Sequence, residues 1–293
     1  MRTGFCVFLA SFAAFGASWF GLVCGPVHQL NGAKETTVLQ SGDKWPQQPS
    51  GAENLGAQVY RASGCAACHT EQIRQTGVMA ELSLTSLGVQ KPEEFKGYVR
   101  ALLAIPELMG ASNTIAGNID KWNGELPAVL YGGQDPAVAS MLADKLKPVG
   151  VKTDSRIVAT GADIARGWGS RQSVAADYLY AAPVQLGNLR AGPDLSNIGV
   201  RAPDVNWHLQ HLYAPGSLVP GSKMPAFRFL FRVQKVGLQP SPDALVLKPE
   251  FAPPAGFEVV PSAEAKQLAA YLASLKANVP LYEAPFTPVT SAK

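Results

Sequence analysis

GCAACHTEQIR, at residues 64–74, decides how this chain is interpreted, because it places two cysteines, a histidine and an arginine within eleven positions. A C-x-x-C-H motif is compatible with three chemistries: a structural zinc site, a redox dithiol and the attachment of a c-type haem. The partners that the rest of the chain can supply distinguish these chemistries.

Zinc and dithiol chemistry each leave part of the motif unexplained. A structural zinc site needs four ligands, and a second Cys/His pair at metal-ligand spacing is missing. His208 and His211 could complete a set of two cysteines and two histidines, but His69 would then have no role. A redox dithiol also uses C-x-x-C, yet it requires no histidine directly after the second cysteine.

Haem attachment explains every position of the motif. The thiols of Cys65 and Cys68 add to the two vinyl groups of one porphyrin, so they must lie one short turn apart. The imidazole of His69 then falls under the iron as its proximal ligand. The chain has a single C-x-x-C-H motif. The sequence therefore predicts one covalently bound haem c, with His69 on the iron.

The composition limits the partners that the chain can have. The net charge is only +3, 16% of the residues are charged, and no dense run of Lys and Arg is present. Nucleic acid is therefore not an expected partner. With 293 residues, 47% of them hydrophobic, the chain can bury a core of ordinary size in one large or two small domains.

The N-terminus carries a long uncharged segment, from Thr3 to Ala33. Its apolar part exceeds the roughly 20 residues that a helix needs to span a bilayer. A cleaved signal peptide is the alternative, since the small residues Ala14 and Gly16 follow a short apolar stretch. The apolar character continues to Val27, however, and this favours an uncleaved transmembrane anchor.

The charge before this segment indicates its orientation. Arg2 is the only charged side chain there, and positive charge is retained on the cytoplasmic side. We therefore expect a single-pass protein of the bacterial inner (cytoplasmic) membrane, with everything after about residue 27 in the periplasm. Cys6 and Cys24 are interpreted as small apolar residues of the helix.

The rest of the chain divides by composition. Residues 1–33 form the predicted anchor, and residues 34–55 are polar with Gly, Pro and Ser, which is typical of a linker. Residues 56–293 form the predicted periplasmic domain, interrupted at about 76–160 by an insertion with helix-like pieces and no His or Cys. A final helix is expected to begin at Ser262. The fold class is therefore mainly α.

A haem c that transfers electrons usually has a sixth ligand, and methionine opposite histidine raises the potential. The candidates are His28, His208, His211, Met79, Met109, Met141 and Met224. Met224 stands in VPGSKMPAF, where Pro and Gly force an irregular backbone that can present the thioether to a buried iron. Met109 and Met141 lie in helix-like pieces and are expected in a core. His208 and His211 share a helix face without a third ligand, and are interpreted as structural.

Several motifs occur in the order typical of a class I cytochrome c, which the chain resembles. They are the helix before GCAACH, RAGPDLSNIGVR at 190–201, PGSKMP at 220–225 and the final helix. In that family the first and last helices cross over the haem edge. The resemblance therefore implies a helical domain of this type, with a long insertion.

The resemblance also implies roles for single residues. The backbone carbonyl of Pro193 would accept the second N–H of His69 and so set the tautomer and orientation of the ring. Met224 matches the distal methionine ligand. Arg201 matches a position that commonly pairs with a haem propionate, and a solvated loop charge is the alternative for it.

The chain is similar, more closely, to the monohaem subunit II of cbb3-type cytochrome c oxidases. The similarity rests on the anchor, SGCAACHTEQIR at 63–74, the stretch from ARGWGSR to NIGVR at 165–201, and NWHLQHLYAPGSLVPGSKMP at 206–225. It covers about half of the chain. The insertion at about 76–160 is a departure, because that family is usually compact there.

This similarity implies electron transfer in aerobic respiration. The subunit would relay single electrons from another c-type cytochrome to a haem-copper catalytic membrane subunit. We expect no catalysis by the chain alone and no small-molecule substrate of its own, because an iron with His and Met ligands has no open position. The alternatives are the cytochrome c subunit of a nitric oxide reductase or periplasmic dehydrogenase, and a free-standing membrane-tethered carrier.

Overall fold

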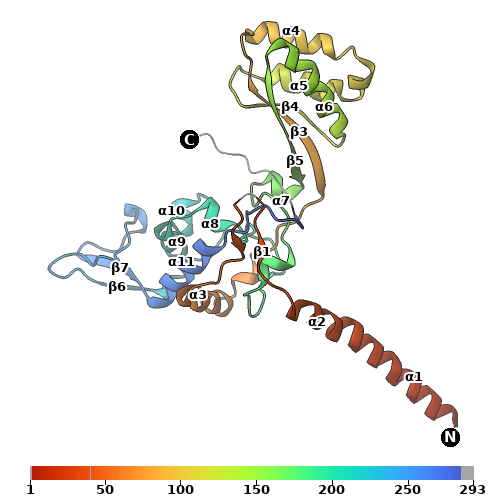
Figure 1. Cartoon of the computed structure of the whole chain (residues 1–293). Helices are drawn as coiled ribbons and strands as arrows, with labels where there is room; N and C mark the ends of the chain where they lie inside the picture. The colour runs from red at the N-terminus through yellow and green to blue at the C-terminus, as the bar shows by residue number, and fades with distance from the viewer. Residues whose placement is uncertain (1, 40, 285–293) are drawn as a thin grey trace.

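The computed structural model describes residues 2–39 and 41–284. Within them, helices dominate, as expected, and three small antiparallel sheets accompany them. Figure 1 shows a rod-like N-terminal helix, a central domain with a projecting hairpin, and a separate lobe. The end of the predicted periplasmic domain, 285–293, lies outside the described residues.

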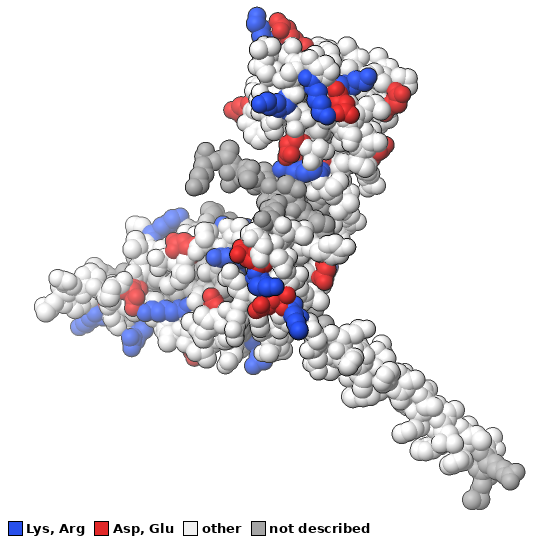
Figure 2. All heavy atoms as spheres, viewed as in Figure 1, with Lys and Arg blue, Asp and Glu red and all other residues white. Residues whose placement is uncertain are grey.

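The N-terminal rod consists of α1 (Arg2–Trp19), a π-helical turn (Phe20–Cys24) and α2 (Gly25–Asn31). The stretch Thr3–Gln29 has a mean hydropathy of 1.9, and the residues that define it as apolar are not buried against the rest of the described chain. Figure 2 shows no charged side chain on the rod between Thr3 and Gln29. By length and composition this helix could cross a membrane, and a signal sequence would have the same features.

The segment after the rod lies against the central domain. Its strands β1 (Thr36–Thr37) and β2 (Lys44–Trp45) form a short antiparallel hairpin. The indole Nε1 of Trp45 donates a hydrogen bond to Asp177 at 2.7 Å, and the backbone N–H of Leu39 donates to the carbonyl of Pro280 at 3.1 Å. The region predicted as a linker therefore makes long-range contacts at both ends of its hairpin.

The central domain is built around two helices that lie far apart in the sequence. Its helices are α3 (Gly51–Ala62), α8 (Ile198–Arg201), α9 (Val205–Tyr213), α10 (Pro215–Leu218) and α11 (Ala263–Ser274). Ser50 caps α3 through a reciprocal capping box with Glu53. Ser262 accepts the backbone N–H of Ala265 at 3.1 Å, which confirms the predicted start of the final helix.

The first and last of these helices, α3 and α11, pack directly on each other. A Cβ atom on Gly56 would lie 2.0 Å from the backbone oxygen of Gln267, so only glycine permits this close approach. The rings of Tyr60 and Tyr271 meet edge to face, with centroids 5.5 Å apart. Tyr60 and Leu268 are fully buried in the core between these helices and α9. This core is called the haem-side cluster below, and its buried residues are Tyr60, Leu195, Ile198, Leu209, Leu212, Leu230, Ala265, Leu268, Ala269 and Leu272.

The hairpin that projects from the central domain follows α10 in the chain (Figure 1). Its strands are β6 (Phe231–Lys235) and β7 (Phe257–Pro261), paired antiparallel with Phe231 opposite Pro261. Phe231 packs edge to face against Tyr213 of α9, which joins the base of the hairpin to the central domain.

The insertion folds as a separate α/β lobe. Its elements are β3 (Gly77–Ser86), α4 (Pro92–Leu102), α5 (Ser112–Lys121), β4 (Ala128–Gly133), α6 (Pro136–Leu146) and β5 (Lys152–Thr160). The strands form an antiparallel sheet in the order β4-β3-β5. The helix-like pieces that the sequence predicts in the insertion are confirmed as helices in α4 and α6. The sheet was not predicted, since the sequence analysis expected a mainly helical fold.

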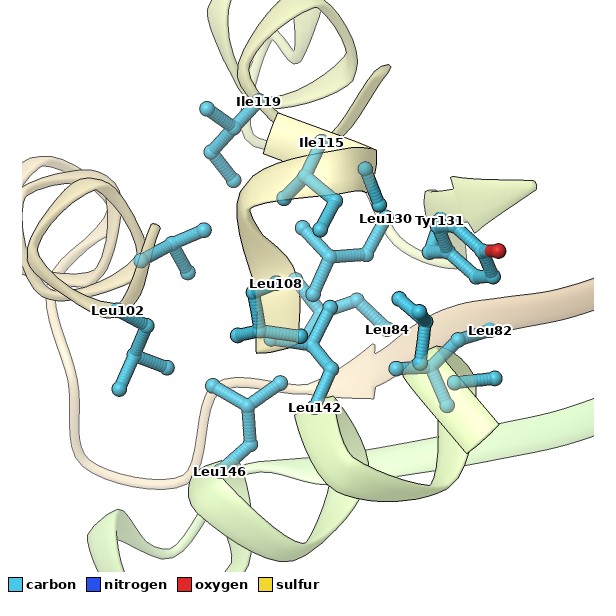
Figure 3. Packing of buried hydrophobic residues seen from close by; sticks show 14 of the residues in the cluster. Leu82, Leu84, Leu102, Leu108, Ile115, Ile119, Leu130, Tyr131, Leu142 and Leu146 are labelled. Carbon is cyan, nitrogen blue, oxygen red and sulfur yellow. The ribbon is translucent and has the colours of Figure 1, made fainter. Parts of the chain in front are cut away.

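The lobe has a hydrophobic core of its own. Every second residue of β3, namely Ala80, Leu82 and Leu84, is buried toward the helices, as the two-residue period of a strand requires. Figure 3 shows Leu82 and Leu84 facing side chains such as Leu142 of α6. All buried residues of this core lie between positions 80 and 151, so the lobe buries its apolar surface independently of the central domain.

The lobe joins the central domain through the start of β3 and the end of β5. Gly77 of β3 pairs with Thr160 of β5, and the backbone N–H of Thr76 donates to the carbonyl of Thr160 at 2.8 Å. The short helix α7 (Ala162–Ala165) follows directly. The chain therefore leaves the central domain just after residue 74 and returns to the same place.

Candidate haem site

The C-x-x-C-H motif forms a tight turn at the end of α3. Gly64 has a φ of +71°, which turns the chain into a single 3-10 turn, Cys65–Ala67. The backbone N–H of Cys68 donates to the carbonyl of Cys65 at 3.1 Å, and the N–H of His69 donates to the same oxygen at 3.0 Å. The two free thiols and the imidazole are thus held on one turn, with Cys65 half-buried and Cys68 exposed.

A second segment, residues 186–195, runs along the motif backbone to backbone. The N–H of Gly192 donates to the carbonyl of Cys68 at 2.9 Å, and the N–H of Leu195 donates to that of Thr70 at 2.7 Å. Gly187 has a φ of +76°, and a Cβ atom there would lie 2.1 Å from the carbonyl oxygen of His69. The motif is therefore positioned by a loop more than 100 residues away.

The imidazole of His69 is oriented by this loop. Its Nδ1 donates to the carbonyl oxygen of Pro193 at 2.8 Å. A Cβ atom on Gly192 would lie 2.3 Å from Cε1 of His69, so the ring packs directly on the backbone. Because Nδ1 is engaged, Nε2 is the nitrogen that remains available to a metal ion.

Met224 lies in the irregular loop that its prolines and glycine predict. Gly221 has a φ of +77°, and the backbone N–H of Phe227 donates to the carbonyl of Leu212 in α9 at 2.8 Å. Met224 is half-buried and packs against the haem-side cluster, as Cys65 does. Met79, Met109 and Met141 all lie in the lobe, so among the described methionines only Met224 shares a cluster with the motif. Met141 packs on the core of the lobe as expected, whereas the expectation of a core position was wrong for Met109, which is 62% exposed.

Arg201 ends α8 next to the same loop. Its Nη2 donates to the backbone carbonyl of Asp194, and its buried Nε has no hydrogen-bond partner within residues 2–39 and 41–284. Burial lowers the pKa of the guanidinium. A carboxylate is the natural partner for such a group.

The two histidines of α9 have different surroundings. His208 is 2% exposed, and its Nε2 lies 2.8 Å from the carbonyl oxygen of Ala202. His211 stacks on Trp207, with ring centroids 4.8 Å apart and an angle of 8° between the planes. Burial is the main cause that lowers the pKa of His211 to about 4, so its ring is neutral.

The sequence analysis missed two buried carboxylates that fasten the segment after the motif. Asp194 accepts hydrogen bonds from the hydroxyl of Thr70 at 2.6 Å and the backbone N–H of Gln72 at 2.8 Å. Asp163 accepts from the backbone N–H of Arg74 at 2.8 Å. Their partners are mostly backbone groups, which no sequence pattern identifies.

A third carboxylate, Glu71, ties the same segment to the final helix. The hydroxyl of Tyr271 lies 2.9 and 2.8 Å from the two oxygens of Glu71 and donates to this carboxylate. Burial raises the pKa of Glu71 to about 7. The motif is thus joined to α11 by a side-chain contact, in addition to the packing of α3.

The surroundings of the cysteines disfavour the two alternative chemistries. Burial raises the pKa of the Cys65 thiol to about 11, whereas catalytic dithiols have a lowered thiol pKa. Within the part of the chain that the structure describes, no three His, Cys, Asp or Glu side chains are placed to hold a metal ion together.

A haem c fits the residues that are present. Two uncrosslinked thiols lie one turn apart beside an imidazole whose Nε2 is available, and a thioether packs on the same apolar cluster. The buried Nε of Arg201 has no partner among the described residues, and a propionate could supply one. The donor set of one imidazole and one thioether is the one that suits an electron-transferring haem iron.

This combination defines the class of protein as a mono-haem c-type cytochrome. Residues 154–276 match the model of the family described as cytochrome c oxidase, mono-heme subunit/FixO. Over these residues the chain matches the mono-haem subunit of cbb3-type oxidases, which transfers electrons to the oxidase. The match begins in β5 and ends just after α11, so the motif at 64–74 lies outside the matched residues. The motif contacts the matched residues through the hydrogen bonds of Cys68, His69 and Thr70 with residues 192–195. No curated protein matches the chain.

Proposed function

We propose that this chain binds one haem c covalently through Cys65 and Cys68, with His69 and Met224 as the iron ligands. The bound haem would supply an iron that alternates between two oxidation states and so carries one electron at a time. The observation that carries the proposal is the engagement of His69 Nδ1 by Pro193, which leaves Nε2 for the iron. The chain would bind no small-molecule substrate of its own.

Each of the other site residues has a proposed task. Pro193 holds the proximal imidazole in one tautomer and one orientation. Arg201 offers its unpartnered Nε to a haem propionate. The apolar haem-side cluster excludes water around the ligands, which raises the potential of an iron centre relative to an exposed one.

The division of the chain follows from the same function. We propose that residues 1–33 remain as a single-pass anchor in the bacterial inner membrane, that 34–55 join it to the domain, and that 56–293 form the periplasmic haem domain. The exposed apolar rod supports the anchor. The partners would be the haem-copper catalytic membrane subunit and other c-type cytochromes.

The first experiment measures the haem. A pyridine haemochrome assay on the purified protein should give one c-type haem per chain, and the double variant Cys65→Ser/Cys68→Ser should give none. Haem that acidified acetone extracts from the parent protein would contradict covalent attachment.

The second experiment concerns the sixth ligand. Met224→His should keep the haem low-spin but lower its midpoint potential, because imidazole replaces the thioether. The weak near-infrared sulfur-to-iron band of the oxidised protein should disappear. Met141→Leu is the matched control, since Met141 packs on the core of the lobe, and it should leave the band unchanged. A band that persists in Met224→His would mean that another group binds the iron.

The third experiment concerns the partners and the anchor. Solubilised in mild detergent, the chain should co-migrate with b-type haem and with oxygen consumption supported by reduced cytochrome c. N-terminal sequencing of the mature protein should start at or beside Met1. Migration as a lone c-haem protein, with respiration unaffected by its deletion, would favour a free-standing tethered carrier, whereas co-migration with nitric oxide reduction would favour that enzyme.

A further inference from the structure

The histidines of α9 differ in one respect that the proposed function does not explain. His208 has a hydrogen-bond partner in the carbonyl of Ala202, at 2.8 Å. The Nδ1 atom of His211 is buried and has no partner within residues 2–39 and 41–284. Buried polar atoms in folded proteins are nearly always paired, so this atom calls for a partner that the polypeptide does not supply.

His211 lies beside the loop that carries Met224. The next residue, Leu212, accepts the backbone N–H of Phe227 through its carbonyl at 2.8 Å, and Phe227 is three positions after Met224. Leu212 and Met224 also belong to the same haem-side cluster. The position of His211 along α9 is therefore tied to the position of the Met224 loop.

Burial is the main cause of the lowered pKa of His211, and electrostatic interactions with His208 and His69 act in the same direction. His69 engages its Nδ1 with Pro193, so Nε2 is the nitrogen left for the iron. Stacking on Trp207 restricts the rotation of the His211 ring. These contacts place a held imidazole beside the loop that carries Met224.

We propose that His211 is a distal-side residue of the haem site, where its Nδ1–H donates a hydrogen bond to the sulfur of Met224. Thioether sulfur is a weak acceptor, and such a bond withdraws electron density from the ligand. In the absence of the thioether, the same imidazole takes the sixth position on the iron. This inference rests on the proposed haem site and assigns His211 a role that His208 does not share.

The test removes the thioether and asks whether His211 replaces it. In reduced Met224→Ala, the haem should remain six-coordinate and low-spin. Met224→Ala/His211→Phe should be five-coordinate and high-spin and should bind carbon monoxide readily, because phenylalanine keeps the stacking ring but has no nitrogen. Met224→Ala/His208→Gln, which keeps a donor for Ala202, should stay low-spin. High-spin haem in Met224→Ala, or low-spin haem in the His211→Phe double variant, would overturn the proposal.

The single variant His211→Phe provides a second measurement in which Met224 is intact. It should retain covalent haem, shift the near-infrared sulfur-to-iron band and lower the midpoint potential, whereas His208→Gln should change neither. An unshifted band and potential in His211→Phe would overturn the hydrogen bond to Met224. Failure of the parent protein to bind covalent haem would instead contradict the proposed function, so the two failures are distinguishable.

Discussion

The Nδ1 atom of His69 donates a hydrogen bond to the carbonyl oxygen of Pro193 across 124 positions of sequence, at 2.8 Å. The lobe at 77–160 lies entirely between these two residues in the chain. The hydrogen bond forms nevertheless, because the lobe leaves and re-enters the central domain at paired strand ends, Gly77 and Thr160. A large insertion can thus be accommodated without disturbing the orientation of the proximal imidazole.

The backbone behind His69 leaves no room for a side chain, and this gives a direct prediction. In Gly192→Ala, the new Cβ would lie 2.3 Å from the imidazole, which must rotate or move away. We expect a large loss of low-spin haem in the purified protein, measured by optical spectroscopy. Gly117→Ala is the control, since nothing lies within 4 Å of a Cβ atom there. Unchanged haem spectra in Gly192→Ala would contradict the described packing.

The crossing of α3 and α11 depends on Gly56. Gly56→Ala would place a Cβ 2.0 Å from the backbone oxygen of Gln267, so the helices must separate. Overpacking of this kind typically costs ~1–3 kcal/mol of unfolding free energy. Gly51→Ala, at the start of the same helix and with nothing within 4 Å, should be close to neutral. Denaturant unfolding monitored by circular dichroism compares the two, and equal midpoints would refute the close crossing.

The buried ion pair of Arg171 and Asp177 fastens the loop 171–180 to the domain. Their side chains are 0% and 4% exposed, and the carboxylate also accepts the indole N–H of Trp45. Asp177→Asn leaves a buried guanidinium without its counter-charge, which we expect to cost ~3–5 kcal/mol.

A surface pair provides the control for this prediction. Asp144 and Lys147 lie 2.6 Å apart but are 67% and 72% exposed, and Asp144→Asn should cost ~0–1 kcal/mol. The two variants are compared by chemical unfolding at the same pH and salt concentration. Similar costs for both would show that Asp177 is not a buried partner.

The lobe should unfold independently of the haem domain, because their cores share no buried residue. Leu142→Ala removes a fully buried side chain from the centre of the lobe and should destabilise it by ~2–5 kcal/mol. Tryptophan fluorescence should report a lower unfolding midpoint for the lobe through Trp122, while the haem spectrum stays unchanged. Met109→Ala, at a side chain 62% exposed, should have little effect. Simultaneous loss of both signals in Leu142→Ala would indicate one cooperative unit.

The sheet of the lobe shows why part of the fold could not be predicted from the sequence. GVMAELSLTS begins with the apolar run Val78–Ala80 and alternates apolar and polar residues only from Ala80 to Thr85, and so short a pattern does not distinguish a strand from a helix. The decisive information is the pairing of β3 with β4 and β5, whose partner residues lie 44 to 83 positions further along the chain. The helices of the lobe were accessible because their pattern is local.

Local chemistry was enough to predict the C-x-x-C-H turn, the apolar N-terminal helix and the start of the final helix at Ser262, since each depends on residues within a few positions of one another. Tertiary structure alone decided that Pro193 meets His69 and that Asp194 and Glu71 fasten the segment after the motif. It also decided that His208 has a hydrogen-bond partner, whereas Nδ1 of His211 has none among the described residues. The physical reason is that the contacts at these positions come from chain segments more than 100 residues apart or from the packing of α9. Such contacts produce no periodic pattern in the sequence.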